Sequence, residues 1–124
     1  MTHKWPVGLA VAVVLSVCCG SLLAHHNSAA MYDQKNPVTL QGKVVEFRMI
    51  NPHSRLVFEV KQADGSVAKW EAEGGSPSAA YRRGWRVDDL KPGDSFTIIG
   101  SPAVDGSRKM EIEKLITTSG KELE

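Results

Sequence analysis

The sequence predicts an all-β domain, a small five-stranded OB-like Greek-key barrel with one short helix between the third and fourth strands. Three observations lead to this prediction. Five short segments have the apolar patterns of strands, and the helix signal falls between the third and the fourth. Gly42 interrupts the first segment, as expected where the long first strand of such a barrel bends or forms a bulge. A β-sandwich is the main alternative, but that fold usually has about seven strands in a domain of about 100 residues.

Residues that favour turns separate the predicted elements. Asp64-Gly65 and Asp105-Gly106 are typical of hairpin turns, because both residue types tolerate positive φ angles. Ser76-Pro77 is typical of a helix start and Gly84 of a helix end. The predicted strands are residues 38–47, 54–61, 67–73, 95–100 and 108–117, and the predicted helix is residues 77–83.

Alternating side chains within these strands predict the core. Leu56, Phe58 and Val60 share one face of the second strand. Trp70 shares a face with Ala68 and Ala72, and small neighbours around a tryptophan indicate core filling. On the fifth strand the predicted inward residues are Met110, Ile112 and Leu115.

The chain divides into four predicted parts. Residues 1–24 have the pattern of a secretory signal peptide, with a basic start, an apolar run and a small final residue, Ala24. Residues 25–36 are predicted to be a flexible segment, residues 37–118 the barrel, and residues 119–124 a loose tail. The predicted location is therefore periplasmic or secreted, with no stable membrane insertion once the signal is removed.

Alternatives to cleavage after Ala24 stay open. An uncleaved anchor is one, because Val7–Ala24 reaches the lower length limit for spanning a bilayer. Cleavage after Ala30 is another, and it would remove His25 and His26. A lipid anchor is less favoured, because no small residue precedes Cys18.

Charge and cysteine content exclude some classes of site. The chain has 15 Lys+Arg and 14 Asp+Glu, and it becomes formally neutral once the leader with Lys4 is removed. Nucleic-acid-binding proteins usually carry a clear basic excess, so nucleic acid is not an expected partner. Both cysteines lie in the leader, which leaves the domain without a disulfide or a cysteine-based zinc site.

Three histidines are the candidate metal ligands. Cleavage after Ala24 would give His25 a free amine. A metal ion could then be bound by this amine and by the imidazoles of His25, His26 and His53, a nitrogen-rich set of ligands. Such a set suits Cu(II), so copper is the candidate cofactor, with Asn51 orienting the imidazole of His53. The alternative is that the two adjacent histidines are ordinary polar residues of a terminal segment.

A basic cluster at the end of the predicted helix supplies the candidate ligand-binding residues. These are Arg82, Arg83, Trp85 and Arg86, which could hold an anion, or a sugar or peptide against the indole. The structural alternative is that the arginines complement the helix dipole and that Trp85 closes one end of the barrel.

No catalytic constellation accompanies these residues. Glu71 and Glu73 share a strand face, but such pairs more often form a solvated stripe. The sequence contains no Ser-His-Asp arrangement, phosphate loop or nucleotide fingerprint. The leading hypothesis is therefore a copper-binding module. The alternative is a metal-free domain that binds an envelope protein or glycan, and an enzyme has the least support.

Six short motifs occur in a characteristic order along the chain. They are Ala24-His25-His26-Asn27-Ser28, Asn36-Pro37-Val38-Thr39-Leu40-Gln41-Gly42, Asn51-Pro52-His53, Gly75-Ser76-Pro77, Arg82-Arg83-Gly84-Trp85 and Leu90-Lys91-Pro92-Gly93-Asp94. Together they resemble a family of small exported bacterial proteins known only by a domain-of-unknown-function label. The resemblance implies export and a small β-barrel, and it implies no established activity.

Overall fold

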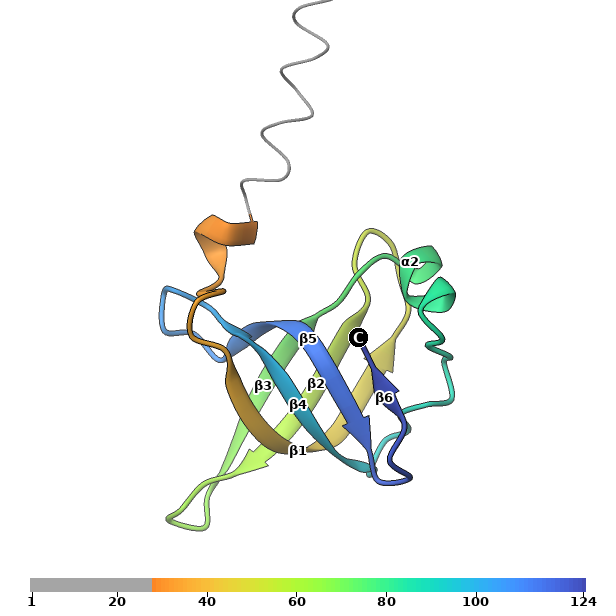
Figure 1. The fold of residues 1–124 in the computed structure, drawn as a ribbon. Coiled ribbons are helices and arrows are strands. Elements are labelled where there is room, and N and C mark those ends of the chain that lie inside the picture. Colours follow the sequence, from red (N-terminus) through yellow and green to blue (C-terminus); the bar gives the residue numbers. More distant parts are fainter. Residues whose placement is uncertain (1–27) are drawn as a thin grey trace, which may run out of the picture. The chain divides into compact units, whose positions relative to one another are not determined.

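Six strands and a short helix make up residues 32–124 of the computed structural model, which describes residues 28–124 (Figure 1). The elements are β1 (Val38–Arg48), β2 (Arg55–Lys61), β3 (Val67–Glu73), α2 (Pro77–Arg82), β4 (Ser95–Pro102), β5 (Lys109–Thr117) and β6 (Glu122–Leu123). Residues 28–31 are helical. Within the described part of the chain, no helix is long and apolar enough to span a membrane.

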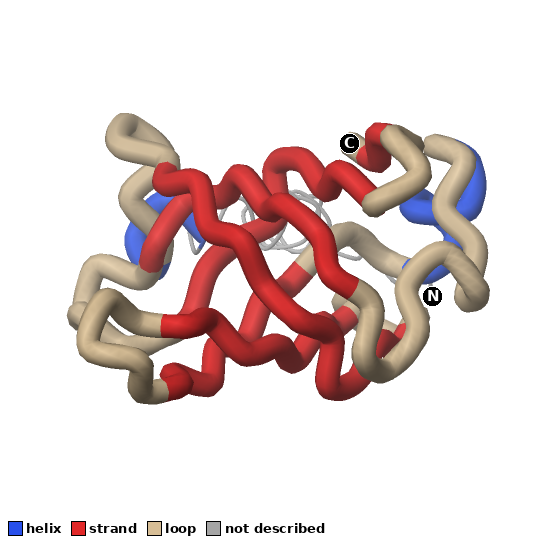
Figure 2. The backbone as a smooth tube through the Cα atoms, turned by 90° about the horizontal axis from the view of Figure 1, so that it is seen from below, coloured by secondary structure: helices blue, strands red, loops and turns tan. Residues whose placement is uncertain are grey.

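Strand β1 belongs to both halves of the barrel. Its first half pairs antiparallel with β4 and its second half with β2, and the change of partner falls at Lys43. The barrel closes where β3 runs parallel to β5 over three residue pairs, from Glu71↔Lys109 to Glu73↔Glu111. Figure 2, seen from below, shows the strands crossing one another between the loops at the two ends of the barrel. The predicted all-β barrel, with its single short helix between the third and fourth strands, is confirmed.

The bulge of β1 does not lie at Gly42, where the sequence led us to expect a bulge or bend. The β1–β2 register shifts between Val44 and Glu46, so Val45 is the extra residue. Gly42 instead allows two aromatic rings to approach the backbone. A Cβ atom there would lie 2.6 Å from Phe58 Cδ2 and 3.0 Å from Phe96 Cζ.

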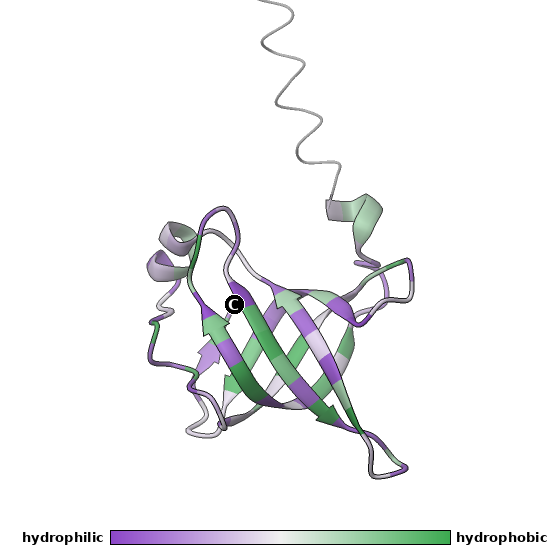
Figure 3. Ribbon diagram, turned by 180° about the vertical axis from the view of Figure 1, so that it is seen from behind, coloured by the Kyte–Doolittle hydropathy of each residue, from purple (hydrophilic) through white to green (hydrophobic). Residues whose placement is uncertain are grey.

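The core forms from the inward faces of the five barrel strands, and the strands alternate between polar and apolar residues in Figure 3. Leu56, Phe58 and Val60 are buried, as predicted. Phe58 makes an edge-to-face contact with Phe96 at 5.3 Å between ring centroids, and it stacks on Trp70 at 6.4 Å. Trp70 packs against the core, which confirms the role predicted for it.

A second bulge sets which residues of β5 face inward. The β4–β5 register runs from Ile99↔Lys114 to Gly100↔Ile112 and so passes over Glu113. In a regular strand, side chains an even number of positions apart face the same side. The inserted residue shifts this alternation, so Met110 and Leu115 both face the core although they are five positions apart. The Glu113 carboxylate accepts a hydrogen bond of 2.7 Å from the Ser101 hydroxyl, which holds the inserted residue in place.

The segment predicted to be flexible, residues 25–36, is attached to the barrel from Tyr32 onward. The Tyr32 side chain is buried, and its hydroxyl donates to Glu73 Oε2 at 3.3 Å. The Asp33 N–H donates to the Pro102 carbonyl oxygen at 2.8 Å. Burial, together with the nearby Glu73 carboxylate, raises the pKa of Tyr32 to about 12. The segment is therefore joined to the barrel through Tyr32 and Asp33, while residues 25–27 lie outside the described part of the chain.

The tail predicted to be loose, residues 119–124, contains strand β6. Leu123 pairs with Leu115 on β5 and is buried. The Lys114 ammonium forms ion pairs of 3.1 Å with Glu122 and 2.6 Å with Glu124. A single apolar residue in this polar stretch gives no strand pattern, which is why the sequence did not indicate the pairing.

Candidate functional site

Helix α2 places the candidate arginines at one end of the barrel. The Ser76 hydroxyl accepts a hydrogen bond from the Ala79 N–H at 3.3 Å, and Pro77 occupies the first turn, so the predicted helix start is confirmed. Ala80 is buried against the core. The chain leaves the helix through Gly84, whose φ of +95° favours glycine.

Trp85 follows the helix and fills the end of the barrel. Its side chain is only 4 % exposed and packs against Phe47 at 5.9 Å between ring centroids. Its indole N–H donates to the main-chain oxygen of Glu124 at 3.3 Å. Because the indole is enclosed, it offers no surface on which a sugar or peptide could stack.

The guanidinium of Arg86 is held by the end of the helix. Its Nη1 donates to the carbonyl oxygens of Tyr81 at 3.1 Å and Trp85 at 2.7 Å. The guanidinium carbon also lies 3.8 Å from the centre of the Tyr81 ring, a cation–π contact. Arg82 and Arg83 are exposed, and neither forms an ion pair with another residue in the range 28–124.

A groove of about 710 Å³ lies between α2 and the segment that follows β1, and we call it the helix groove. Figure 1 shows these two parts of the chain at the same end of the barrel. The groove is lined by Met49, Pro77, Ser78, Tyr81, Arg82, Arg86, Val87 and Asp88.

Two of the lining side chains are strongly exposed apolar groups. Tyr81 is 58 % exposed and Val87 is 66 % exposed, and Ile50, next to the lining residue Met49, is exposed as well. Grouped exposed apolar side chains with a polar rim are typical of a binding surface. The sequence indicated the arginines but not their neighbours Tyr81 and Val87, because this short irregular segment has no periodicity from which exposure could be predicted, and Met49 comes from a separate part of the chain.

His53 lies in the loop between β1 and β2, after a cis peptide bond between Asn51 and Pro52. The imidazole is exposed, and it forms no hydrogen bond with Asn51. Residues 28–124 contain no group of three or more potential metal ligands. His25 and His26 lie outside the described residues.

The paired carboxylates of β3 both have structural partners. Glu71 Oε2 lies 2.8 Å from Arg55 Nη2, and Glu73 accepts the hydroxyl hydrogen bond of Tyr32. These contacts fix the carboxylates to neighbouring strands and to the N-terminal segment. Their arrangement fits the interpretation of Glu71 and Glu73 as surface residues of β3 and not as a catalytic pair.

Comparison with known proteins gives a family but no activity. No curated protein sequence matches the chain. A family profile matches residues 12–111, a range that includes β1 to β4 and the whole helix groove. The profile describes a family of unknown function. The chain therefore belongs to the DUF6152 family.

Proposed function

We propose that this protein is an exported binding module that holds a segment of a partner protein in the helix groove. The observation that carries the proposal is the joint exposure of Tyr81 and Val87 beside the side chains of Arg82 and Arg86. The partner segment would present an apolar side chain next to a carboxylate. Export is the part of the proposal that rests on the signal-like residues 1–24.

The apolar half of the groove supplies affinity. Tyr81 and Val87 are already exposed, so covering them removes apolar surface from water at a gain of about 25 cal/mol per Å². Other exposed apolar residues are placed differently: Val67 begins β3 and Val104 lies in the turn after β4. Neither of these two valines lines the groove.

The charged half of the groove favours an acidic partner. Two arginines line it against one acidic residue, Asp88. The Arg82 guanidinium has no ion-pair partner among residues 28–124, so it is available to a carboxylate. A hydrogen bond between a guanidinium and a carboxylate is about twice as strong as a neutral one. The Arg86 guanidinium, held by two carbonyl oxygens, contributes positive charge without needing to be ordered on binding.

A displayed library of random peptides tests this proposal. Selection on the processed protein is expected to enrich peptides with an aromatic or aliphatic residue within a few positions of Asp or Glu. Binding of the selected peptides should weaken about tenfold or more in Tyr81→Ala and in Arg82→Glu, since each removes a central contact. The measurement is the dissociation constant from fluorescence anisotropy with labelled peptide.

Val67→Ser is the matched control, because Val67 is 59 % exposed on another part of the barrel. This variant should bind the peptides as the wild type does. The proposal fails if the selected peptides lack acidic residues, or if Tyr81→Ala and Arg82→Glu bind them as tightly as Val67→Ser does.

A second proposal, copper binding, is supported by residue chemistry. His25 and His26 directly follow a predicted cleavage site, and His53 is exposed with no side-chain partner among the described residues. An amine and imidazoles form the nitrogen-rich set that Cu(II) prefers. The imidazoles bind in their neutral form, so affinity should fall as the pH is lowered.

Calorimetric titration of the protein that begins at His25 tests the copper proposal. We expect sub-micromolar affinity for Cu(II), and a loss of about tenfold or more in His53→Ala. A protein that begins at Met31 is the control, and it should lose most of the affinity. Absence of sub-micromolar binding by the protein that begins at His25 rules the proposal out.

A further inference from the structure

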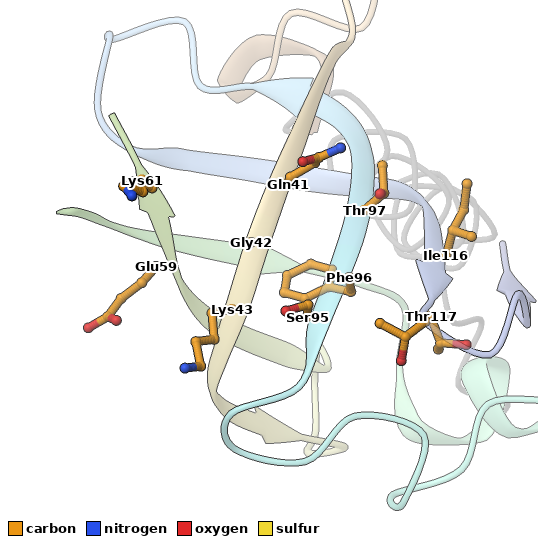
Figure 4. Close-up of a pocket in the computed structure, with 11 residues that line it drawn as sticks. Gln41, Gly42, Lys43, Glu59, Lys61, Ser95, Phe96, Thr97, Ile116 and Thr117 are labelled. Carbon is orange, nitrogen blue, oxygen red and sulfur yellow. The ribbon is translucent and has the colours of Figure 1, made fainter. Parts of the chain in front are cut away.

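A second, polar surface crosses the outside of the barrel and shares no lining residue with the helix groove. It is a shallow trough of about 360 Å³, which we call the strand trough. Figure 4 shows Gln41 and Lys43 of β1, with Glu59 and Lys61 of β2 to one side and Thr97, Ile116 and Thr117 to the other. The remaining lining residues are Gly42, Ser95, Phe96 and Thr118.

Strand pairing arranges the outward side chains of the trough in rows. Lys43 is the partner of Glu59 on β2 and also of Ser95 on β4. In the neighbouring row, Gln41 lies opposite Thr97, and Thr97 lies opposite Ile116 on β5. Four adjacent strands span about 14 Å, so the rows present hydrogen-bonding groups over the length of a short oligomeric ligand.

The polar groups of these rows are not used within the domain. Six side chains form no side-chain hydrogen bond or ion pair with any other residue in the range 28–124, namely Gln41, Lys43, Glu59, Lys61, Ser95 and Thr97. Lys43 and Glu59 are opposite charges on paired positions, where ion pairs commonly form. On the next pair of strands an ion pair does form between diagonal neighbours: Arg55 Nη2 lies 2.8 Å from Glu71 Oε2, although the register partner of Arg55 is Glu73.

The chemistry of the trough favours a carbohydrate over a protein. Its polar groups are an amide, hydroxyls, two ammonium groups and one carboxylate, all of which form hydrogen bonds, and the half-buried Ile116 adds an apolar side chain at the β5 end. Protein interfaces usually have an apolar or aromatic centre, but the Phe96 ring here is buried in the core. The excess of one positive charge among Lys43, Glu59 and Lys61 favours a negatively charged ligand. We infer that the strand trough binds an acidic oligosaccharide, a chain of sugars that carries carboxylate groups.

Calorimetry with two defined probes tests the inference on the processed protein. The acidic probe is a hexamer of galacturonic acid, and the neutral probe is a hexamer of glucose. We expect saturable binding of the acidic hexamer and at least about tenfold weaker binding of the neutral one, because the latter lacks charged hydrogen bonds with the ammonium groups.

Variants then locate the binding surface. Lys43→Met should weaken binding of the acidic hexamer about tenfold, and Thr97→Val, which replaces only a hydroxyl by a methyl group, should weaken it severalfold. Lys109→Met is the matched control, since Lys109 is an exposed lysine at the start of β5, at the opposite end of that strand from the trough residues Ile116 and Thr117. Circular dichroism spectra establish that each variant is folded.

Three results would overturn the inference. These are no saturable binding of the acidic hexamer, equal binding of both hexamers, and an equal loss in Lys109→Met and Lys43→Met, which would indicate attraction to net charge alone. The helix-groove variant Arg82→Glu should bind the acidic hexamer like the wild type. Failure of the peptide proposal and failure of this inference are therefore observed separately.

Discussion

Trp85→Ala is expected to lower the free energy of unfolding by about 3–5 kcal/mol. The indole is almost completely buried at the end of the barrel, and its removal leaves a cavity beside Phe47. It also removes the hydrogen bond to the Glu124 main-chain oxygen. Urea denaturation followed by far-ultraviolet circular dichroism measures the change without relying on tryptophan fluorescence.

Tyr81→Ala is the control for Trp85→Ala. Tyr81 lies four residues earlier, but its side chain is mainly exposed and lines the helix groove. Its loss should change the free energy of unfolding by less than about 1 kcal/mol while it weakens peptide binding about tenfold or more. Trp85→Phe, which keeps an aromatic ring, should be intermediate. A change below about 1 kcal/mol in Trp85→Ala would contradict the structural role and make the indole a ligand-binding candidate again.

Leu123→Ala is expected to lower the free energy of unfolding by about 2–5 kcal/mol. The side chain is 1 % exposed, belongs to the core cluster and lies on β6 opposite Leu115. A loose tail, as the sequence indicated, would give almost no change. The two interpretations therefore differ by several kcal/mol in one denaturation experiment.

Val104→Ala is the control for Leu123→Ala. It also shortens an aliphatic side chain, but Val104 is 61 % exposed in a turn, so the change should stay within about 0.5 kcal/mol. Similar, small changes in both variants would show that β6 does not contribute to the stability of the barrel in solution.

The barrel could be predicted because its signals are local. Gly65 and Gly106 have φ angles of +86° and +77°, so the Asp-Gly pairs mark turns that other residues rarely form. Ser76 and Pro77 likewise determine where α2 begins through contacts within a few residues. Since three predicted strands precede this helix and two predicted strands follow it, the order of elements already favoured the OB-type topology.

Features that depend on distant partners could not be predicted. Tyr32 and Leu123 lie in segments without a strand pattern, and they pair with Ala103 and Leu115, respectively, on other parts of the chain. The insertion at Val45 has no residue signature, since nothing in its type distinguishes it from Val44.

The candidate sites also divide into features with a local sequence signal and features that depend on distant parts of the chain. The sequence located the arginines near the end of α2 and left two roles open for Trp85, ligand binding beside the arginines and closure of one end of the barrel. The structure turns the indole inward and leaves Tyr81 as the exposed ring. The strand trough joins four strands from across the chain, so no local motif could have indicated it.

The short parallel pairing of β3 with β5 is a place where the barrel can open before the longer pairings of its other strands separate. Only three residue pairs join these strands, whereas β2 and β3 share seven. If this seam separates, the strands remain one continuous sheet in the order β3-β2-β1-β4-β5-β6. Opening of the seam would therefore give an unrolled sheet that keeps its other ladders, with one side of the core exposed to water. Amide protons at the seam, such as that of Glu71, should then exchange with solvent before those between β1 and β2.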